Sequence, residues 1–509
     1  MDGMIDRSRF SPRTVVARLL RLSPARWPVH GLTLLFVLIT FYTGLHLAYG
    51  TPMGDVADEP AHIARSAALL HGQIFGVRHA TPRGADSGVL MDSGLAQAAR
   101  AETITRQTRL THPSGRISAA QVARARAISW SGQRIYVQAS GAVEYFPAFY
   151  LPGALGIAAG ALAGQRPLAA LYTGRLFMLL SYIMLGAAAL SLARFGRPLL
   201  FAILSLPMSV SLAASFNQDG QLIAAAALCG ALLTWEPKAW PQARWIAAAI
   251  FAVFLCSKPP YGLLLFCAML PLTRRGMLRR LLQLGCFGLP ALIWVLVMLR
   301  FTFTPVRRKP YHPGPLWPGS RAITLHAVDP TGGLRVLIAH PAQIFLLPYH
   351  DIIDNFGQFR IQFIGVLGWL NVSLPTDLYH DWSIALLAAA LATLFARNAS
   401  ERTINWRLTN AILVLALVLI TIIAVELSLY LDWTNLGGGS IIGMQGRYFI
   451  VIVPFFLLVL PRLGDSVNRW CHWRGAGNAA SLLLTVPAML MALDGAWILP
   501  PLIARSFYQ

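Results

Sequence analysis

The stretch "VHGLTLLFVLITFYTGLHLAYGTPMGDVADEPAHIARSAALLHGQ" (residues 29–73) decides the fold, because a long apolar run is followed at once by acidic residues. Residues 29–49 are predominantly apolar and numerous enough to cross a bilayer as one helix. Directly after this run come Asp55, Asp58 and Glu59, in a chain that has only 21 acidic residues against 42 basic ones. The sequence therefore places scarce carboxylates where the chain first leaves the membrane.

The overall composition supports a membrane location for most of the 509 residues. Hydrophobic residues make up 56% of the chain and charged residues 12%, whereas globular proteins have about 45–50% and about 25%. The mean hydropathy is +0.56. A water-soluble core cannot bury this excess of apolar side chains, but a bilayer can, so we expect an all-α integral membrane protein.

The net charge of +21 has a topological interpretation. Basic residues lie in short segments between apolar runs, as they do in membrane proteins that keep positive loops in the cytoplasm. No platform of alternating basic and aromatic residues is present, so we exclude nucleic acid as a partner. None of the five cysteines lies in the two long polar loops, and no disulfide framework is indicated there.

Further apolar runs predict about eleven crossings, with the N-terminus in the cytoplasm and the C-terminus outside. We expect residues 245–271 to cross out and back around the sequence "SKPP", and residues 146–164 not to cross fully. The expected spanning runs are residues 29–49, 168–193, 199–216, 221–235, 278–301, 382–396, 408–431, 448–460 and 479–499.

This topology divides the chain into four parts. Residues 1–28 form a basic cytoplasmic N-terminus, and residues 29–301 form a transmembrane core that includes an outer loop at 50–145. Residues 302–380 form a second outer loop, and residues 381–509 form the C-terminal transmembrane helices. The two loops then face the same side of the membrane.

The first outer loop opens with a helix start at Asp58, Glu59 and Pro60. Proline suits the first helical position, and either acidic side chain suits a capping role at the free amide groups. The helix that follows is amphipathic and is expected to lie at the membrane surface. Its polar side chains include His62 and Arg65. A capping role and a catalytic role for the carboxylates both remain open.

A second polar site occurs in "SLAASFNQDGQLIAAAAL" (residues 211–228), where Asn217 and Asp219 stand at the outer end of a span. A carboxylate at membrane depth is costly, and it normally has a partner or a function. The alternative is that Asp219 caps the helix that begins there.

Lys258, in "CSKPPYG" (residues 256–262), is the third candidate. The two prolines end the preceding helix and leave the lysine at an outer turn. An ammonium group there suits a lipid phosphate. The alternative is a lysine that extends to the headgroups without a specific ligand.

The fourth candidate segment, "GGGSIIGMQGRYFIVIVPFF" (residues 437–456), delivers Gln445, Arg447 and Tyr448 to the start of an apolar helix. Arginine binds phosphate through two parallel hydrogen bonds, and the amide groups of a helix N-terminus favour an anion. The alternative is a structural ion pair of Arg447 with Asp432 or Asp219.

Acidic and basic side chains from four distant segments are thus expected to meet on the outer face. This combination suits a lipid-linked phosphate donor and a hydroxyl acceptor. A carboxylate takes the proton of the acceptor, and cations stabilise the departing phosphate. No nucleotide-binding loop is found, and "GVLGW" (residues 365–369) is a poor match to one.

The same segments carry a family resemblance. "DEPAHIARSAALLHG", "SFNQDGQLIA", "SKPPY", "IGVLGWLNVSLP" and "GMQGRYFIVIVPF" together resemble a family of bacterial polytopic membrane proteins of unassigned function. The resemblance covers nearly the whole chain, and the pair "DE-P-x-H" and "QGRYF" is its most specific part. That family in turn is similar to the GT-C superfamily of glycosyltransferases, which take sugars from polyprenyl-phosphate carriers.

The resemblance implies roles for the candidate residues in a bacterial inner-membrane enzyme with a periplasmic active face. Asp58 or Glu59 would be the general base, and Asp219 would match a second acidic motif. Lys258 resembles a lysine that contacts the donor phosphate. The expected partners are a polyprenyl-phosphate-linked sugar, a glycan, lipid or protein acceptor, and membrane lipids.

The other candidates are assigned by their chemistry. Arg447 is expected to hold the phosphate, assisted by Arg65, while Gln445 and Tyr448 line the substrate site. Three residues are expected to orient the acceptor or a divalent cation: Asn217, Asp219 and His62. A divalent cation is the one cofactor that these residues suggest, although the sequence "DVADE" lacks the paired DxD of metal-dependent sites, and the need for a metal stays open.

Two rival functions use the same charges. A transporter or flippase would bind a headgroup without breaking a bond. Such proteins usually have two related halves, with broken helices at matching positions in each half. An envelope assembly protein would not need the carboxylates. A separate metal site formed by His340, His350 and His380 with Asp351 and Asp354 matches no standard ligand spacing.

Overall fold

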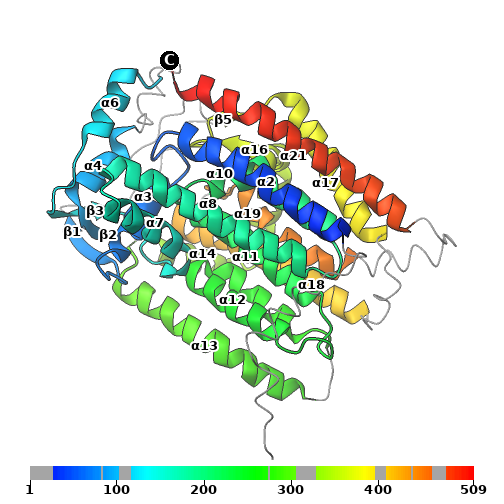
Figure 1. Cartoon of the computed structure of the whole chain (residues 1–509). Helices are drawn as coiled ribbons and strands as arrows, with labels where there is room; N and C mark the ends of the chain where they lie inside the picture. Colours follow the sequence, from blue (N-terminus) through cyan, green and yellow to red (C-terminus); the bar gives the residue numbers. More distant parts are fainter. Residues whose placement is uncertain are drawn as a thin grey trace, which may run out of the picture.

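The computed structural model describes residues 27–81, 84–102, 116–272, 276–304, 328–395, 408–436, 440–460 and 477–508 (Figure 1). The basic N-terminal segment 1–26 and the basic segments 397–407 and 462–474, on which the predicted topology partly depends, lie outside these residues.

Five described helices are long and apolar enough to cross a membrane. They confirm the helices predicted at residues 29–49, 168–193, 278–301, 408–431 and 479–499. Much of their surface stays exposed; in α13, for example, Leu278 is 72% exposed and Leu282 65%. The five are α2 (Trp27–Gly50), α8 (Pro167–Leu192), α13 (Met277–Phe301), α18 (Leu408–Trp433) and α21 (Gly477–Phe507).

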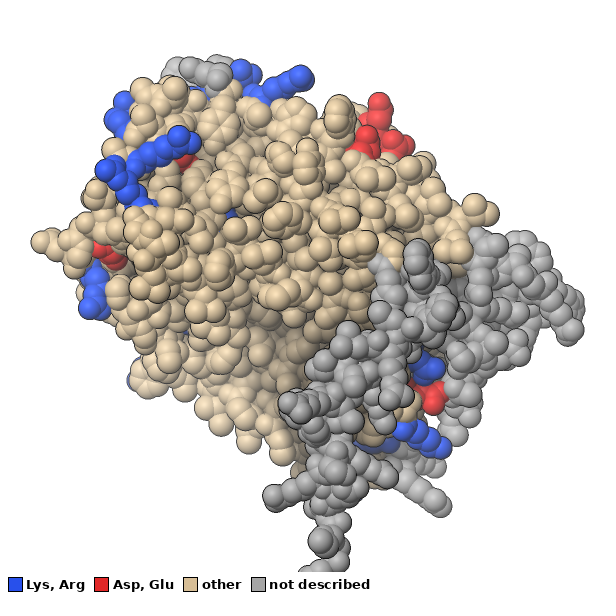
Figure 2. Space-filling view, in the orientation of Figure 1, with Lys and Arg blue, Asp and Glu red and all other residues tan. Residues whose placement is uncertain are grey.

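The surface agrees with a bilayer environment. Figure 2 shows a broad face without charged side chains, with Lys, Arg, Asp and Glu gathered toward its two ends. Such a face would be costly in water and is expected against lipid tails. The chain is therefore a helical membrane protein.

Most other predicted spans are short or broken, and the structure does not show the predicted arrangement of eleven crossings. The run predicted at residues 382–396 lies within α17 (Thr376–Phe395), an unbroken helix of 20 residues. Residues 199–216 form α9 (Arg197–Leu204) and α10 (Pro207–Ala213), because Pro207 cannot continue the preceding helix. Among the described residues, five helices are both long and apolar enough to span, or six if one bent pair counts as a span. That pair, α14 (Pro330–Ala339) and α15 (Gln343–Asp354), is bent by 107°.

The remaining apolar helices pack inside or beside the long ones. The run at residues 146–164, which we expect not to cross fully, is η3 followed by a twelve-residue α7. The elements and bounds are η3 (Pro147–Tyr150), α7 (Leu151–Leu162), α11 (Gln218–Leu233), α12 (Ala243–Ser257), η4 (Pro259–Met269), α17 (Thr376–Phe395), α19 (Arg447–Ile450) and η6 (Val453–Leu458).

The first polar loop contains a small β-sheet, which the all-α prediction does not include. Strands β1 (Val77–Thr81), β2 (Gly84–Asp92) and β3 (Arg134–Gln138) form an antiparallel sheet in the order β1-β2-β3. Helices α4 (Ser93–Ala101) and α6 (Ala119–Ala127) accompany it. We call the end of the helix bundle that carries this sheet the sheet end (left in Figure 1).

Several chain segments return to the sheet end. The C-terminal end of α21 lies there, because the Ile117 amide donates to the Phe507 carbonyl at 2.8 Å. A second hairpin, β4 (Val366–Leu367) and β5 (Val372–Ser373), touches the end of the first span: the Trp369 Nε1 donates to the Gly54 carbonyl at 2.9 Å. These contacts surround the segment that leads into α3 (Glu59–Leu69).

Candidate functional site

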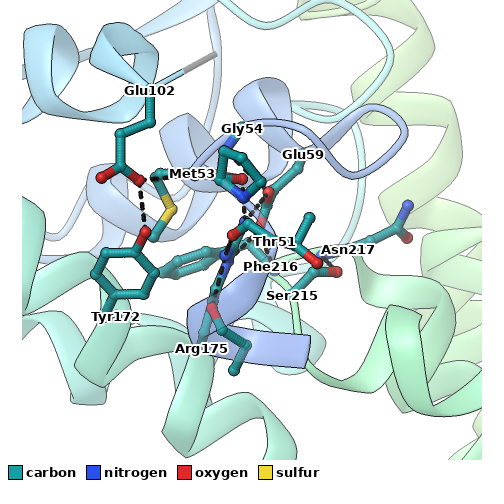
Figure 3. Close-up of polar contacts among 12 residues, drawn as sticks. Thr51, Met53, Gly54, Glu59, Glu102, Tyr172, Arg175, Ser215, Phe216 and Asn217 are labelled. Carbon is teal, nitrogen blue, oxygen red and sulfur yellow. Dashed lines mark hydrogen bonds and ion pairs between the residues drawn. The ribbon is translucent and has the colours of Figure 1, made fainter. Parts of the chain in front are cut away.

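An internal ion pair fixes the segment that carries the first two candidates (Figure 3). The Arg175 guanidinium of α8 donates to both Glu59 oxygens, at 2.8 and 2.6 Å, and neither side chain is exposed. Arg175 also donates to the carbonyls of Ala48, Thr51 and Pro52, at 2.7, 2.5 and 2.9 Å. A buried charge needs a partner and further hydrogen bonds, and this arrangement supplies both.

The Glu59 carboxylate is fully used by these contacts. In addition to Arg175, it accepts hydrogen bonds from the amides of Gly54 and Phe216, at 3.0 and 3.1 Å. Its two oxygens already accept four hydrogen bonds, and the side chain is fully buried, so it is not placed to contact a substrate hydroxyl. Glu59 is therefore structural, and the choice of base that the sequence leaves open narrows to Asp58.

Asp58 has the opposite environment. Its side chain is 43% exposed and accepts from Arg447 Nη2 at 2.8 Å. It precedes α3 but makes no side-chain hydrogen bond to the helix, so the capping interpretation does not hold for it. Its φ of 63° is in the left-handed region, which costs a non-glycine residue free energy. The local fold keeps this strained residue in place beside a cation.

Asp219 joins the other three segments. Its Oδ1 lies 2.5 Å from the Lys258 ammonium, and its Oδ2 lies 3.4 Å from Arg447 Nε. The helix cap is Asn217, whose Oδ1 accepts from the Asp219 amide at 2.8 Å and whose Nδ2 donates to the Ala57 carbonyl at 2.9 Å. Capping is thus done by Asn217, and the Asp219 carboxylate stays free to bind the two cations.

The result is a chain of alternating charges: Asp58, Arg447, Asp219 and Lys258, which we call the charge chain. Asp219 and Arg447 are almost fully buried, whereas the Lys258 side chain is 18% exposed. The exposed ends of the charge chain are therefore a carboxylate and an ammonium. Two cations and two carboxylates give this site no net charge, so an added anion is not repelled.

The segment before η6 contributes Tyr448 and Gln445 to the site. The Lys258 ammonium lies 4.6 Å from the centre of the Tyr448 ring, and the Tyr261 hydroxyl donates to the Tyr448 carbonyl at 2.8 Å. Gln445 has a buried Oε1 without a partner among the described residues. Helix α19 has only four residues, so the predicted helix N-terminal anion site is not formed here.

Helix α3 is covered by protein and does not have the exposed polar face that the sequence analysis expects of a helix at the membrane surface. Most of its residues are buried, because β2, α7 and η3 pack around it. His62 lies 2.7 Å from the Tyr150 hydroxyl, and burial lowers its pKa to about 4. His62 is therefore neutral at pH 7. Arg65, fully buried, donates from Nε and Nη2 to the Tyr145 carbonyl at 3.2 and 2.8 Å, and not to a carboxylate of the charge chain.

Sequence reasoning missed the partners of these residues. Arg175 is an arginine inside a predicted span, and an ionisable residue at membrane depth is itself a signal of function or structure. Tyr145, Tyr150 and Tyr261 carry no such signal, because aromatic residues are common in apolar runs. Glu144, which stands next to Tyr145 in the first polar loop, gave no recognisable spacing either.

Within the described ranges, no three His, Cys, Asp or Glu side chains are grouped so that they would hold a metal ion. Asp351 belongs to the histidine and aspartate group that the sequence analysis considered as a metal site. Its carboxyl group instead interacts with that of Glu426 on α18. In the charge chain, each carboxylate already binds a cationic side chain.

Comparison with known proteins gives one match. A family model described as "Predicted membrane protein (DUF2142)" matches residues 41–456. This range contains every residue of the charge chain. No curated protein and no solved structure matches the chain.

Proposed function

The chain belongs to this family of predicted membrane proteins, and we propose that it is a glycosyltransferase which moves a sugar from a polyprenyl-phosphate donor to an envelope acceptor. The observation that carries the proposal is the contact of a strained, half-exposed Asp58 with Arg447, beside Lys258. A reactive carboxylate next to two phosphate-binding cations is what a transfer from a lipid-linked phosphate requires.

The proposed reaction uses the charge chain as follows. The Asp58 carboxylate accepts the proton of an acceptor hydroxyl, whose oxygen forms the new bond to the anomeric carbon of the sugar. The bond between that carbon and the phosphate oxygen breaks, and the electron pair leaves with the polyprenyl phosphate. Lys258 and Arg447 stabilise the charge on the departing phosphate. The proton on Asp58 then passes to water.

Asp219 has a positioning role in this scheme. It is buried and bonded to both cations, so it fixes their separation and does not accept the substrate proton. Asn217 holds the start of α11 against the Ala57 carbonyl, one residue before Asp58. Neutral His62 orients the acceptor through its unpaired ring nitrogen, while Tyr150 fixes its ring.

The proposal includes a location. A GT-C-like organisation would put the sheet end and the charge chain on the periplasmic face of a bacterial inner membrane, with the N-terminus in the cytoplasm. Polyprenyl-phosphate sugars are membrane-bound, so the donor reaches the site from the lipid. This orientation is supported by the basic segments between the apolar runs.

The test is transfer by the full-length protein in nanodiscs, supplied with a labelled pool of polyprenyl-phosphate sugars and an envelope extract. We expect Asp58→Asn to reduce transfer by about two to four orders of magnitude, the usual contribution of a general base. The matched control is Asp86→Asn, which changes a carboxylate on β2 that binds Tyr136 at 2.6 Å. Equal transfer by wild type and Asp58→Asn would refute the base, and no transfer by wild type would refute the reaction.

One observation favours a transporter as the second candidate. The bent pair α14–α15 packs against α18, where Glu426 is fully buried and interacts with Asp351. Broken helices and buried carboxyl groups are typical of transport sites. A transporter needs two compartments, so product formation in detergent solution would exclude this candidate as the sole function.

A further inference from the structure

Glu144 is a buried carboxylate that the proposed reaction does not use. It stands between β3 and η3, and both its side-chain oxygens are inaccessible and have no side-chain hydrogen-bond partner among the described residues. The backbone amides of Gly141 and Glu144 lie close enough to favour its charged form, but burial outweighs them. Burial raises its pKa to about 7. Buried polar groups are nearly always bonded, and an ionisable one without a partner suggests a missing ligand.

A donor with the same property lies close to it. Arg65 uses Nε and Nη2 on the Tyr145 carbonyl, but its Nη1 is buried without a partner among the described residues. The charges of Arg65 and Glu144 interact, and each contributes to the pKa shift of the other. An unused Arg65 donor and a carboxyl group without a side-chain donor among the described residues therefore lie in the same region.

This region adjoins the charge chain. The Tyr145 ring lies 6.5 Å from the His62 ring and is nearly parallel to it, at 17°. The charge of Glu144 acts on the Tyr145 phenol, and so do those of Asp219 and Asp58. Tyr145, the chain neighbour of Glu144, therefore contacts the side of His62 and lies within electrostatic range of Asp58 and Asp219.

Aromatic side chains flank Glu144 on another side. The Trp294 Nε1 donates to the Glu144 carbonyl at 3.4 Å. The Trp294 ring lies 5.0 Å from the Phe146 ring and 5.6 Å from the Phe75 ring. Aromatic groups beside a few polar groups are the usual composition of a small-molecule site.

We propose that Glu144 and Arg65 form a subsite which binds the hydroxyl groups of a sugar beside Asp58. A hydroxyl both donates and accepts, so a pair of adjacent hydroxyls satisfies the Glu144 oxygens and Arg65 Nη1 together. A phosphate or carboxylate ligand would satisfy Arg65 but would be repelled by Glu144. Arg65 therefore recognises sugar and not phosphate.

The sugar has two possible sources, the lipid-linked donor and the acceptor glycan. That the subsite takes part in a transfer reaction rests on the proposed function. That it binds sugar hydroxyls does not. The experiment separates the sources by using two sets of probes with the full-length protein in nanodiscs. One set is a panel of methyl hexosides, and the other is short-chain polyprenyl-phosphate hexoses with the unglycosylated polyprenyl phosphate as reference.

Binding is measured by saturation-transfer NMR at pH 8, where the Glu144 carboxylate is charged. We expect Glu144→Gln to weaken hexose binding about tenfold or more, as loss of a charged hydrogen bond does, and to leave binding of unglycosylated polyprenyl phosphate unchanged. The matched control is Glu236→Gln, which removes a half-buried carboxylate beyond the far end of α11. Arg65→Lys, which keeps the charge but loses the planar donor group, is expected to act like Glu144→Gln.

The outcomes separate the two proposals. If the binding of methyl hexosides weakens in Glu144→Gln, the subsite belongs to the acceptor. If only the binding of the lipid-linked hexoses weakens, it belongs to the donor. Hexose binding that is equal in wild type, Glu144→Gln and Arg65→Lys would overturn the subsite, as would no hexose binding by folded wild type. Hexose binding without any affinity for polyprenyl phosphate would keep the subsite and overturn the proposed function.

Discussion

Arg447 Nη2 lies 2.8 Å from Asp58 Oδ2, although 389 positions separate the two residues in the chain. The contact joins the segment before α3 to the start of α19 at the sheet end. It exists because Arg175 and Glu59 hold the first segment and because Asp219 binds Arg447 from the side. The two adjacent carboxylates therefore differ: Glu59 is buried in an ion pair with Arg175, whereas Asp58 is half-exposed and is the base of the proposed reaction.

Glu59→Gln should destabilise the fold far more than Asp58→Asn. Glu59→Gln leaves the buried Arg175 charge without its counter-ion, so we expect a loss of about 3–5 kcal/mol in the free energy of unfolding. Asp58→Asn breaks a half-exposed pair and should cost less than about 1 kcal/mol, because asparagine also tolerates the left-handed backbone. Thermal unfolding in detergent measures both. Equal destabilisation by the two variants would contradict the division of roles.

Gly446 should be essential because a Cβ at this position would come within 2.0 Å of the Phe359 carbonyl oxygen and 2.6 Å of the Phe363 amide nitrogen. Both are backbone atoms, so α16 (Phe356–Gly365) or Arg447 must move. We expect Gly446→Ala to abolish transfer and to lower the yield of folded protein. Gly285→Ala, where a Cβ meets nothing within 4 Å, is the control. Normal transfer by Gly446→Ala would show that the position of Arg447 is not critical.

His62 should make the fold sensitive to acid. Burial lowers its pKa from 6.5 to about 4, and it faces Asp58, Asp219, Lys258 and Arg447. A histidine with a lowered folded-state pKa contributes stability that is complete above pH 6.5 and is lost as the pH falls toward 4. We expect His62→Asn to unfold at a temperature that varies less between pH 7 and pH 5 than that of wild type. An identical pH profile would contradict a buried neutral histidine.

Glu144 should have the opposite dependence. Its pKa is raised from 4.5 to about 7 by burial, with Arg65 opposing and Asp432 adding to the shift. The stability it contributes is complete below pH 4.5 and is lost as the pH rises through 7. Glu144→Gln should therefore be more stable than wild type at pH 8, by about 3 kcal/mol, and equal to it at pH 4.5. Calorimetry at the two pH values measures this, and a variant less stable than wild type at pH 8 would contradict it.

The long helices were predictable from sequence because a bilayer imposes one rule on them, sustained hydrophobicity over a fixed length. The run at residues 199–216 is equally hydrophobic and was therefore predicted as a span. Pro207 breaks it into two short helices, which are buried inside the bundle and do not need to span. The β-sheet was missed because its strands are short and lie among polar residues. Buried α3 was read as a surface helix, since periodicity does not show what covers the polar face.

The charged residues of the site were predictable as candidates because carboxylates and cations are scarce and stand at the ends of apolar runs. Their pairing was not predictable. Asp58 and Glu59 are neighbours with the same chemistry, and only Arg175, from a helix 116 positions later, distinguishes them. The burial of Glu144 and of Arg65 Nη1 without side-chain partners results from the packing of segments that are distant in the chain, and no sequence pattern predicts it.

The most direct test of the central claim is whether the charge chain binds a lipid-linked phosphate. Full-length protein in nanodiscs is titrated with a short polyprenyl phosphate and with the polyprenol of equal length, for wild type, Lys258→Met and the control Lys238→Met at the far end of the bundle. We predict that wild type and Lys238→Met prefer the phosphate, and that Lys258→Met loses about tenfold or more of this preference. Equal affinity of wild type for the two lipids, or an unchanged preference in Lys258→Met, would contradict the account.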